Sequence, residues 1–167
     1  MPDDDRAEEP RWLSEDEQRA WEAVATLLFK LPGPLESQLQ RDSGLTLFEY
    51  MVLSYLSMSP EHTTRMSELA RLSNSSLSRL SNVVTRCERR GWIERSPDPD
   101  DARYTVATLT GAGYQQVVDA APGHVEAVRH FVVDPLTPAQ LRAITTAVAR
   151  IRPLLEGPDR PRPSGAC

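Results

Sequence analysis

Cysteine and lysine are scarce in this chain of 167 residues. The two cysteines, Cys87 and Cys167, stand far apart, which excludes a disulfide framework and a cysteine-based metal motif. The three histidines are scattered, so no metal and no cofactor is expected. Every basic residue is an arginine except Lys30.

Long apolar runs are absent as well, and none approaches the roughly 20 residues that a membrane span requires. Residues 1–10 are acidic and lack an apolar segment, so no secretory signal is expected there. With 40% hydrophobic and 26% charged residues, the composition is that of a globular protein of the cytoplasm. No nucleophile–base constellation and no glycine-rich phosphate loop is present, so we do not expect an enzyme.

The charge is unevenly distributed along the chain. A net charge of -5 argues against a nucleic-acid partner, because phosphate binding requires arginine and lysine. Residues 71–95, however, contain six arginines and only two glutamates, which gives this segment a net charge of +4. A local basic patch is sufficient to attract DNA, and arginine binds phosphate and guanine in a bidentate manner.

Helical patterns dominate between two polar ends. Capping boxes at Ser14 and Thr46, and a third cap at Thr137, mark helix starts. Residues 32–34 (Pro-Gly-Pro) should interrupt the first helix, and Pro122 with Gly123 should kink or break a later one.

The central segment has a distinct order of elements. A short helix over residues 66–72 is followed by Asn74 as a predicted N-cap and by a longer helix over residues 75–90, which ends at Gly91. Residues 92–95 and 104–109 are predicted strands of a hairpin. The expected fold is therefore mainly α with a small antiparallel β-hairpin, arranged as a winged helix-turn-helix.

The longer helix is predicted to have two faces. The inward set is Leu77, Leu80, Val84 and Cys87, whereas the outward set is Ser75, Arg79, Asn82, Arg86 and Arg89. Small hydroxyls allow close approach to DNA, and asparagine and arginine supply bidentate contacts to adenine and guanine edges in the major groove. An isolated helix of this kind would more often be an ordinary surface helix, and the neighbouring helix, turn and hairpin favour DNA binding.

Five short segments resemble the MarR family (multiple antibiotic resistance regulators). They are residues 66–73 (MSELARLS), 77–80 (LSRL), 90–95 (RGWIER), 101–103 (DAR) and 109–110 (LT). The resemblance covers roughly residues 15–155 and implies a homodimer with one winged domain per subunit.

The composition of the two ends and the resemblance of the segment between them together predict five regions. They are an acidic disordered tail (1–12), N-terminal dimerisation helices (13–44), the winged helix-turn-helix DNA-binding domain (45–110), C-terminal dimerisation helices (111–155) and a disordered Pro/Arg-rich tail (156–167).

The resemblance assigns roles to residues of the longer helix and the wing. Those expected in the major groove are Ser75, Ser76, Ser78, Arg79 and Asn82, with Arg86 near the DNA backbone. Asp101 and Arg103 should pair to stabilise the wing, with Arg103 near phosphate or the minor groove. Ala102 replaces a basic residue common in the family, and the loop is acidic through Asp98, Asp100 and Asp101. A weaker wing contribution is therefore expected.

A small-molecule effector, often an aromatic acid in this family, is implied between the dimerisation helices and the DNA-binding domain. Candidate pocket residues are Trp21, Phe48, Tyr50 and Tyr55, although aromatic residues at helical spacing belong more often to a core. Cys87 is expected to be a buried apolar filler and not a redox sensor.

Two functional hypotheses follow from the sequence. The favoured one is a transcriptional regulator, a repressor that binds an inverted-repeat operator in double-stranded DNA as a homodimer and is released by a ligand. The alternative is a winged-helix protein-interaction module that does not bind DNA, which the net negative charge and the acidic loop would favour.

Overall fold

The computed structural model describes residues 10–156. The tails predicted for residues 1–12 and 156–167 lie almost entirely outside this range, although Glu156 still belongs to a helix. The described chain is mainly helical with one small antiparallel sheet, which confirms the predicted fold class.

Three helices form the N-terminal part: α1 (Glu15–Lys30), α2 (Pro32–Ser43) and α3 (Leu47–Met58). The predicted capping boxes at Ser14 and Thr46 are both present. In each, the N-cap side chain accepts a hydrogen bond from the N3 backbone amide, and the side chain of the N3 glutamate accepts one from the N-cap backbone amide. The first helix is interrupted near the predicted place, but the interruption lies at Leu31, and residues 32–34 form the first turn of α2. Gly44, at a φ of 62°, ends α2 in the left-handed conformation that favours glycine.

The central part contains the predicted helix pair and hairpin. Its elements are η1 (Pro60–His62), β1 (Thr63–Arg65), α4 (Met66–Leu72), α5 (Leu77–Arg89), β2 (Ile93–Pro97) and β3 (Thr105–Leu109). The sheet order is β1-β3-β2, and both pairings are antiparallel. Strand β1 was not predicted, because three residues carry no recognisable alternation.

Three further elements complete the chain: α6 (Gly111–Val128), η2 (Arg129–Val133) and α7 (Pro138–Glu156). Pro122 lies inside α6, so of the predicted kink or break the break does not occur. A proline costs one backbone hydrogen bond, but α6 packs along α2, and Ala120 and Ala127 are buried on either side of Pro122. Tertiary packing therefore outweighs the local preference.

The junction between the hairpin and α6 is tight. Thr110 caps α6 by accepting from the Gly113 amide at 3.0 Å, and its hydroxyl donates to the Gly91 carbonyl at 2.6 Å. A Cβ at Gly113 would lie only 2.1 Å from the Trp92 carbonyl oxygen, so only glycine fits this position. These contacts fix the hairpin relative to the long helix.

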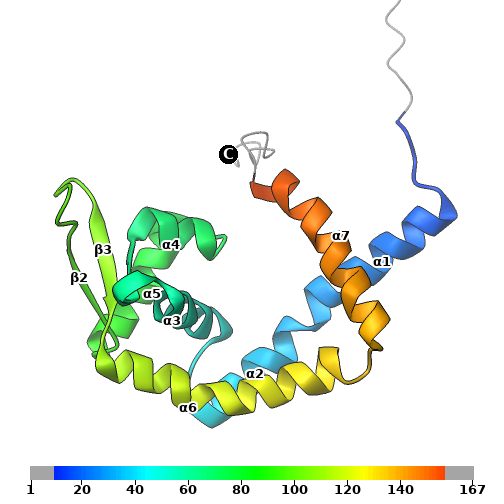
Figure 1. Cartoon of the computed structure of the whole chain (residues 1–167). Coiled ribbons are helices and arrows are strands. Elements are labelled where there is room, and N and C mark those ends of the chain that lie inside the picture. Colours follow the sequence, from blue (N-terminus) through cyan, green and yellow to red (C-terminus); the bar gives the residue numbers. More distant parts are fainter. Residues whose placement is uncertain (1–9, 157–167) are drawn as a thin grey trace, which may run out of the picture.

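Figure 1 shows the arrangement of the elements, with the β2–β3 hairpin at one end and α1 and α7 at the other. Helix α6 runs along one edge and connects the two ends, with α2 beside it. The core lies between α2, α3, α4, α5 and the sheet, and its fully buried members include Leu39, Val52, Leu56, Leu69, Leu80, Val84 and Ile93. Among the described residues, no helix is long and apolar enough to cross a membrane.

Candidate nucleic-acid interface

The start of α5 is built by three consecutive polar residues. Ser76, and not Asn74, is the N-cap, because its side chain accepts from the Arg79 amide at 3.2 Å. Asn74 instead adopts a φ of 48°, which turns the chain between α4 and α5. Ser75 is tied back to α4 through its amide to the Ala70 carbonyl and its hydroxyl to Ser73. The helix therefore begins at Leu77, two residues later than the predicted start at residue 75.

Helix α5 has one buried and one exposed face. Leu80, Val84 and Cys87 are buried as predicted, but Leu77 is 54% exposed and Val83 occupies the core instead. Leu77 is the first residue of α5, and its position on the apolar side of the helix does not bury it. On the outward side Ser76, Ser78, Asn82 and Arg89 are exposed, and Ser75 is half-buried.

Two arginines of α5 are braced against α3. The Arg79 guanidinium lies 4.6 Å from the centroid of the Phe48 ring, a cation–π geometry. The Arg86 Nε donates to Glu49 Oε1 at 3.0 Å. Both side chains are thereby held at the flank of the exposed face, so their guanidinium groups have restricted positions before any ligand arrives.

Glu49 is a buried carboxylate, with a side chain only 4% exposed. Burial alone would raise its pKa, but the hydrogen bonds from Thr46 and the Arg86 guanidinium outweigh this effect and hold the pKa below the usual value of 4.5. The carboxylate is therefore charged at neutral pH and connects the first turn of α3 to α5.

A second brace joins α5 to the hairpin. Arg95 on β2 donates to Ser81 at 3.3 Å and to Thr85 at 3.0 Å, and it forms an ion pair with Glu88. These three partners lie on consecutive turns of α5. Arg95 thus links β2 to three positions of α5, in addition to the packing of both elements in the core.

The loop between β2 and β3 contains the predicted wing pair. Arg103 and Asp101 form a bidentate ion pair, with nitrogen–oxygen distances of 2.6 and 2.9 Å. The Arg103 side chain is nevertheless 85% exposed. The Asp98 carboxylate is buried and paired with Arg65, so this loop presents less negative charge than its sequence suggests.

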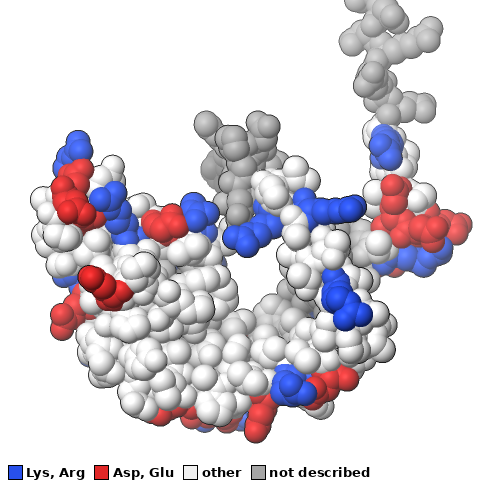
Figure 2. All heavy atoms as spheres, viewed as in Figure 1, with Lys and Arg blue, Asp and Glu red and all other residues white. Residues whose placement is uncertain are grey.

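Charged side chains are unevenly distributed over the surface of the molecule. In Figure 2, basic and acidic side chains lie together at the tip of the β2–β3 hairpin, whereas much of the body below is uncharged. At this end of the molecule, exposed arginines lie on α5 (Arg79, Arg86 and Arg89) and at the wing tip (Arg103). Basic side chains also lie on α7 (Figure 2), so positive charge is present at both ends of the described chain.

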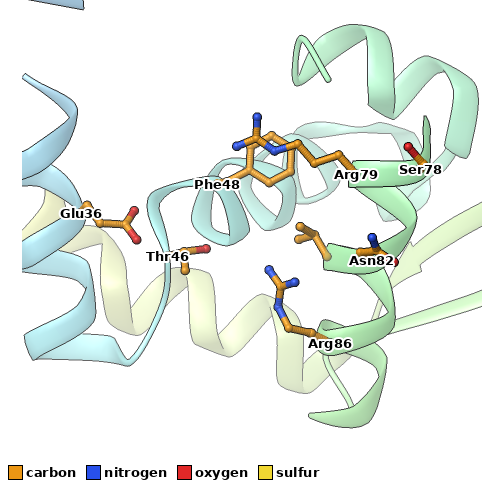
Figure 3. A pocket seen from close by; sticks show the side chains of 8 residues that line it. Glu36, Thr46, Phe48, Ser78, Arg79, Asn82 and Arg86 are labelled. Carbon is orange, nitrogen blue, oxygen red and sulfur yellow. The ribbon is translucent and has the colours of Figure 1, made fainter. Parts of the chain in front are cut away.

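A pocket of about 530 Å³ lies beside α5 (Figure 3). Its lining residues come from α2, α3 and α5 and are Glu36, Thr46, Phe48, Ser78, Arg79, Asn82, Val83 and Arg86. Figure 3 shows the Arg79 side chain lying over Phe48 and Arg86 extending toward Thr46. The lining combines two arginines, of which Arg86 is paired with Glu49, with the Glu36 carboxylate, hydroxyls and one aromatic ring.

The four aromatic candidates for a ligand site do not converge. Phe48 lines the pocket just described, whereas the Tyr50 ring contacts the His124 ring in a tilted arrangement with centroids 4.5 Å apart. Tyr55 packs against the core, and Trp21 is 55% exposed on α1.

Other reactive side chains have structural surroundings. Burial raises the pKa of the Cys87 thiol to about 12, so it is protonated at neutral pH. Within residues 10–156, no group of three or more His, Cys, Asp or Glu side chains could hold a metal ion.

These elements define a winged helix-turn-helix protein, in which α4 and α5 form the helix pair and β2 and β3 form the wing. A family model described as the MarR family matches residues 43–103. Sco3205, a MarR family transcriptional regulator of Streptomyces coelicolor solved in complex with DNA, is 38% identical, with 93% of this chain and 98% of Sco3205 covered and a TM-score of 0.86. AbsC, a MarR family regulator of the same species, is 36% identical, with 89% and 99% covered and a TM-score of 0.83.

Curated relatives match over a shorter segment. YdcH of Bacillus subtilis, an uncharacterised HTH-type transcriptional regulator, is 32% identical over 80 residues, which are 47% of this chain and 54% of YdcH. The transcriptional repressor MprA of Escherichia coli is 27% identical over 86 residues, which are 52% of this chain and 49% of MprA. The chain thus spans about half the length of the curated relatives it matches.

The chain belongs to the MarR family of transcriptional regulators. This confirms the family resemblance stated from the sequence. The relatives are regulators and not enzymes, in agreement with the sequence-based expectation.

The sequence did not indicate the pairing roles of four residues in this region, which are Glu49, Arg65, Arg95 and Asp98. Asp98 was noted only as part of an acidic loop. Glu49 was recognised only as part of a capping box. Its second role depends on a contact across 37 positions, for which a single sequence carries no signal. Arg95 was counted only as part of the basic segment.

Proposed function

We propose that this protein is a sequence-specific regulator that binds double-stranded DNA with α5 in the major groove. The observation that carries the proposal is the exposed face of Ser76, Ser78, Asn82 and Arg89, flanked by the braced Arg79 and Arg86. Serine and asparagine supply hydrogen bonds to base edges and phosphates, and the arginines supply charge. The solved complex of Sco3205 with DNA supports this reading by analogy.

Binding should be tested by fluorescence anisotropy on DNA that flanks the gene, with random duplex as the reference. The affinity for random duplex should fall steeply as salt rises, because bound phosphates release counterions. Asn82→Ala should reduce the preference for the specific site, with a loss of about ten-fold for a bidentate base contact. Arg129→Ala, which removes a cation paired with Asp134 and distant from α5, is the matched control.

The protein-interaction module is the alternative outcome of this experiment. Absence of binding to any duplex at low salt would reject the DNA-binding proposal and favour that module. The buried and paired Asp98 weakens the case for the alternative, because one of the three acidic loop residues on which it depended is neutralised.

We propose that the regulator is a homodimer and, in its simplest mode, a repressor in the cytoplasm. No residue of α1 is buried, and its exposed apolar residues include Trp21, Val24, Leu27 and Leu28. Helix α7 exposes a second stripe, formed by Ile144, Val148, Ile151 and Leu154. Apolar surfaces of this extent indicate a partner. Two copies would place two α5 helices about 34 Å apart on an inverted-repeat operator.

The pocket beside α5 is the place that we propose for an effector. A ligand there would contact Arg79 and Arg86 directly and would favour a conformation in which α5 no longer fits the groove. Benzoate and salicylate are suitable probes, and each should raise the melting temperature and release bound DNA. Phe48→Ala should abolish both effects, whereas Tyr55→Phe should preserve them. A stabilising probe that leaves DNA bound would contradict the proposal.

A further inference from the structure

Arg65 connects two parts of the DNA-binding region that are distant in sequence. It is the last residue of β1 and also the N-cap residue of α4, the first helix of the helix pair. Its backbone lies opposite Val106 of β3 in the sheet. From this position its side chain reaches the loop between β2 and β3, where it forms an ion pair with Asp98.

Asp98 organises that loop from within. Its side chain is only 6% exposed. Its carboxylate accepts from the backbone amides of Asp100 at 2.8 Å and Asp101 at 3.3 Å, in addition to Arg65 Nε. Its own amide donates to the Tyr104 carbonyl at 2.9 Å, which closes the base of the loop. The Asp98 carboxylate is thus the shared acceptor for both the turn and the Arg65 brace.

The Arg65 guanidinium makes a second contact with the loop. It lies 4.7 Å from the centroid of the ring of Tyr104, the residue immediately before β3. Arg65 therefore holds both ends of the loop, Asp98 on the outgoing side and Tyr104 on the returning side. The guanidinium of Arg103, the only cation in residues 98–104, is carried by this held loop and is exposed.

We propose that Arg65 and Asp98 are positioning residues for DNA binding. They fix the wing to the N-terminus of α4, so that Arg103 is presented to DNA at a set distance from α5. Asp98 therefore supports DNA binding although its charge has the same sign as phosphate. This inference depends on the proposed DNA-binding function.

Two carboxylates of one loop provide the test, because the proposal predicts opposite signs for them. Asp100 is exposed, so Asp100→Asn removes a charge that repels phosphate and should strengthen binding by about two-fold. Asp98→Asn removes the same charge but weakens the Arg65 brace, and it keeps an oxygen for the two backbone amides. It should weaken binding about five-fold, with the slope of log Kd against log salt reduced by about one as the Arg103 contact is lost.

A double-mutant cycle separates positioning from general destabilisation. If Asp98 acts through Arg103, the variant carrying both Asp98→Asn and Arg103→Ala should bind no more weakly than Arg103→Ala alone. Hydroxyl-radical footprints of Asp98→Asn should lose the flanking protection by the wing and retain the central protection by α5. Should Asp98→Asn fold poorly, Arg65→Gln enters the same cycle and footprint.

Results that overturn this inference differ from the result that rejects the proposed function. Stronger binding by Asp98→Asn, equal to that of Asp100→Asn, would overturn the inference and show that the loop charge acts only by repulsion. Additive losses in the cycle would overturn it as well. Absence of duplex binding by the unaltered protein would instead reject the proposed function.

Discussion

Two leucines three positions apart on α5 lie in opposite environments. Leu80 is completely buried in the core, whereas Leu77 is 54% exposed in the first turn. Because the two side chains are chemically identical, a difference between the stability losses caused by their replacement reflects their surroundings. The exposed position of Leu77 also leaves an apolar side chain at the end of α5 that is proposed to enter the groove.

The first prediction concerns this pair. Leu80→Ala should lower the free energy of unfolding by about 2–5 kcal/mol, because it removes buried contacts and leaves a cavity. Leu77→Ala should cost less than about 1 kcal/mol, as expected for a partly exposed residue. Chemical denaturation at fixed protein concentration measures both. Equal losses for the two variants would show that Leu77 is buried in the folded protein.

The second prediction concerns the Cys87 thiol, whose pKa burial raises to about 12. In a Cys167→Ser background, Cys87 should react with iodoacetamide about a thousand-fold more slowly than an unburied thiol at pH 8, because the thiolate is the nucleophile. Unfolding in guanidinium should restore the ordinary rate and serves as the control. Fast labelling of the native protein would reopen a redox role.

At the scale of elements, α5 is attached on two sides, by Glu49 of α3 and by Arg95 of β2. The two attachments lie on different flanks of the helix and leave its outward face open. A helix that must enter a groove at a set angle benefits from such rigid supports, because less entropy is lost on binding.

The third prediction addresses the Glu49 attachment. Glu49→Gln retains the length of the side chain but loses its charge, so stability at pH 7 should fall by about 1–3 kcal/mol, as for a hydrogen bond to a charged group. The folded pKa of Glu49 lies below its usual 4.5, so its contribution is present above about pH 4.5 and is lost as the pH falls through the folded pKa.

The variant should therefore lose less stability than the unaltered protein between pH 6 and pH 3. Denaturation curves across this range measure the difference. Glu94→Gln is the matched control, because it makes the same chemical change at an exposed position on β2. Parallel pH profiles for Glu49→Gln and the unaltered protein would contradict the assigned role of the pair.

Local signals explain which elements the sequence could predict. The capping boxes at Ser14 and Thr46 act within four residues, and both are present in the structure. Strand β1 depends on a partner more than 40 residues away, and Pro122 lies in a helix that packs along α2, which is also distant in sequence. For the site, the sequence indicated which residue types face outward. It did not indicate that Phe48 and Glu49 hold two of the arginines, because those contacts depend on the packing of α3 against α5.

At the scale of the whole molecule, the two ends differ in how they are supported. The hairpin end surrounds a buried core, whereas α1 and α7 at the other end expose apolar stripes (Figure 1). A chain with this distribution should gain much of its stability from a second copy. The concentration of protein then becomes a variable of stability.

The fourth prediction follows from that dependence. The melting temperature should rise by a few degrees for each ten-fold increase in protein concentration, because association stabilises only the folded chain. Val148→Asp places a charge in the exposed apolar stripe of α7 and should abolish the dimer in light scattering, with a lower melting temperature that no longer depends on concentration.

Thr146→Asp is the matched control for this experiment, because Thr146 lies on the opposite face of the same helix and is exposed. It introduces the same charge into α7 and should leave the dimer intact. If both variants remain dimeric, the α7 stripe is not the interface, and the α1 stripe, tested by Leu28→Asp, becomes the alternative. If the unaltered protein melts at one temperature at every concentration, the exposed stripes have no second copy to cover them, and the proposed operator geometry of two paired half-sites fails with them.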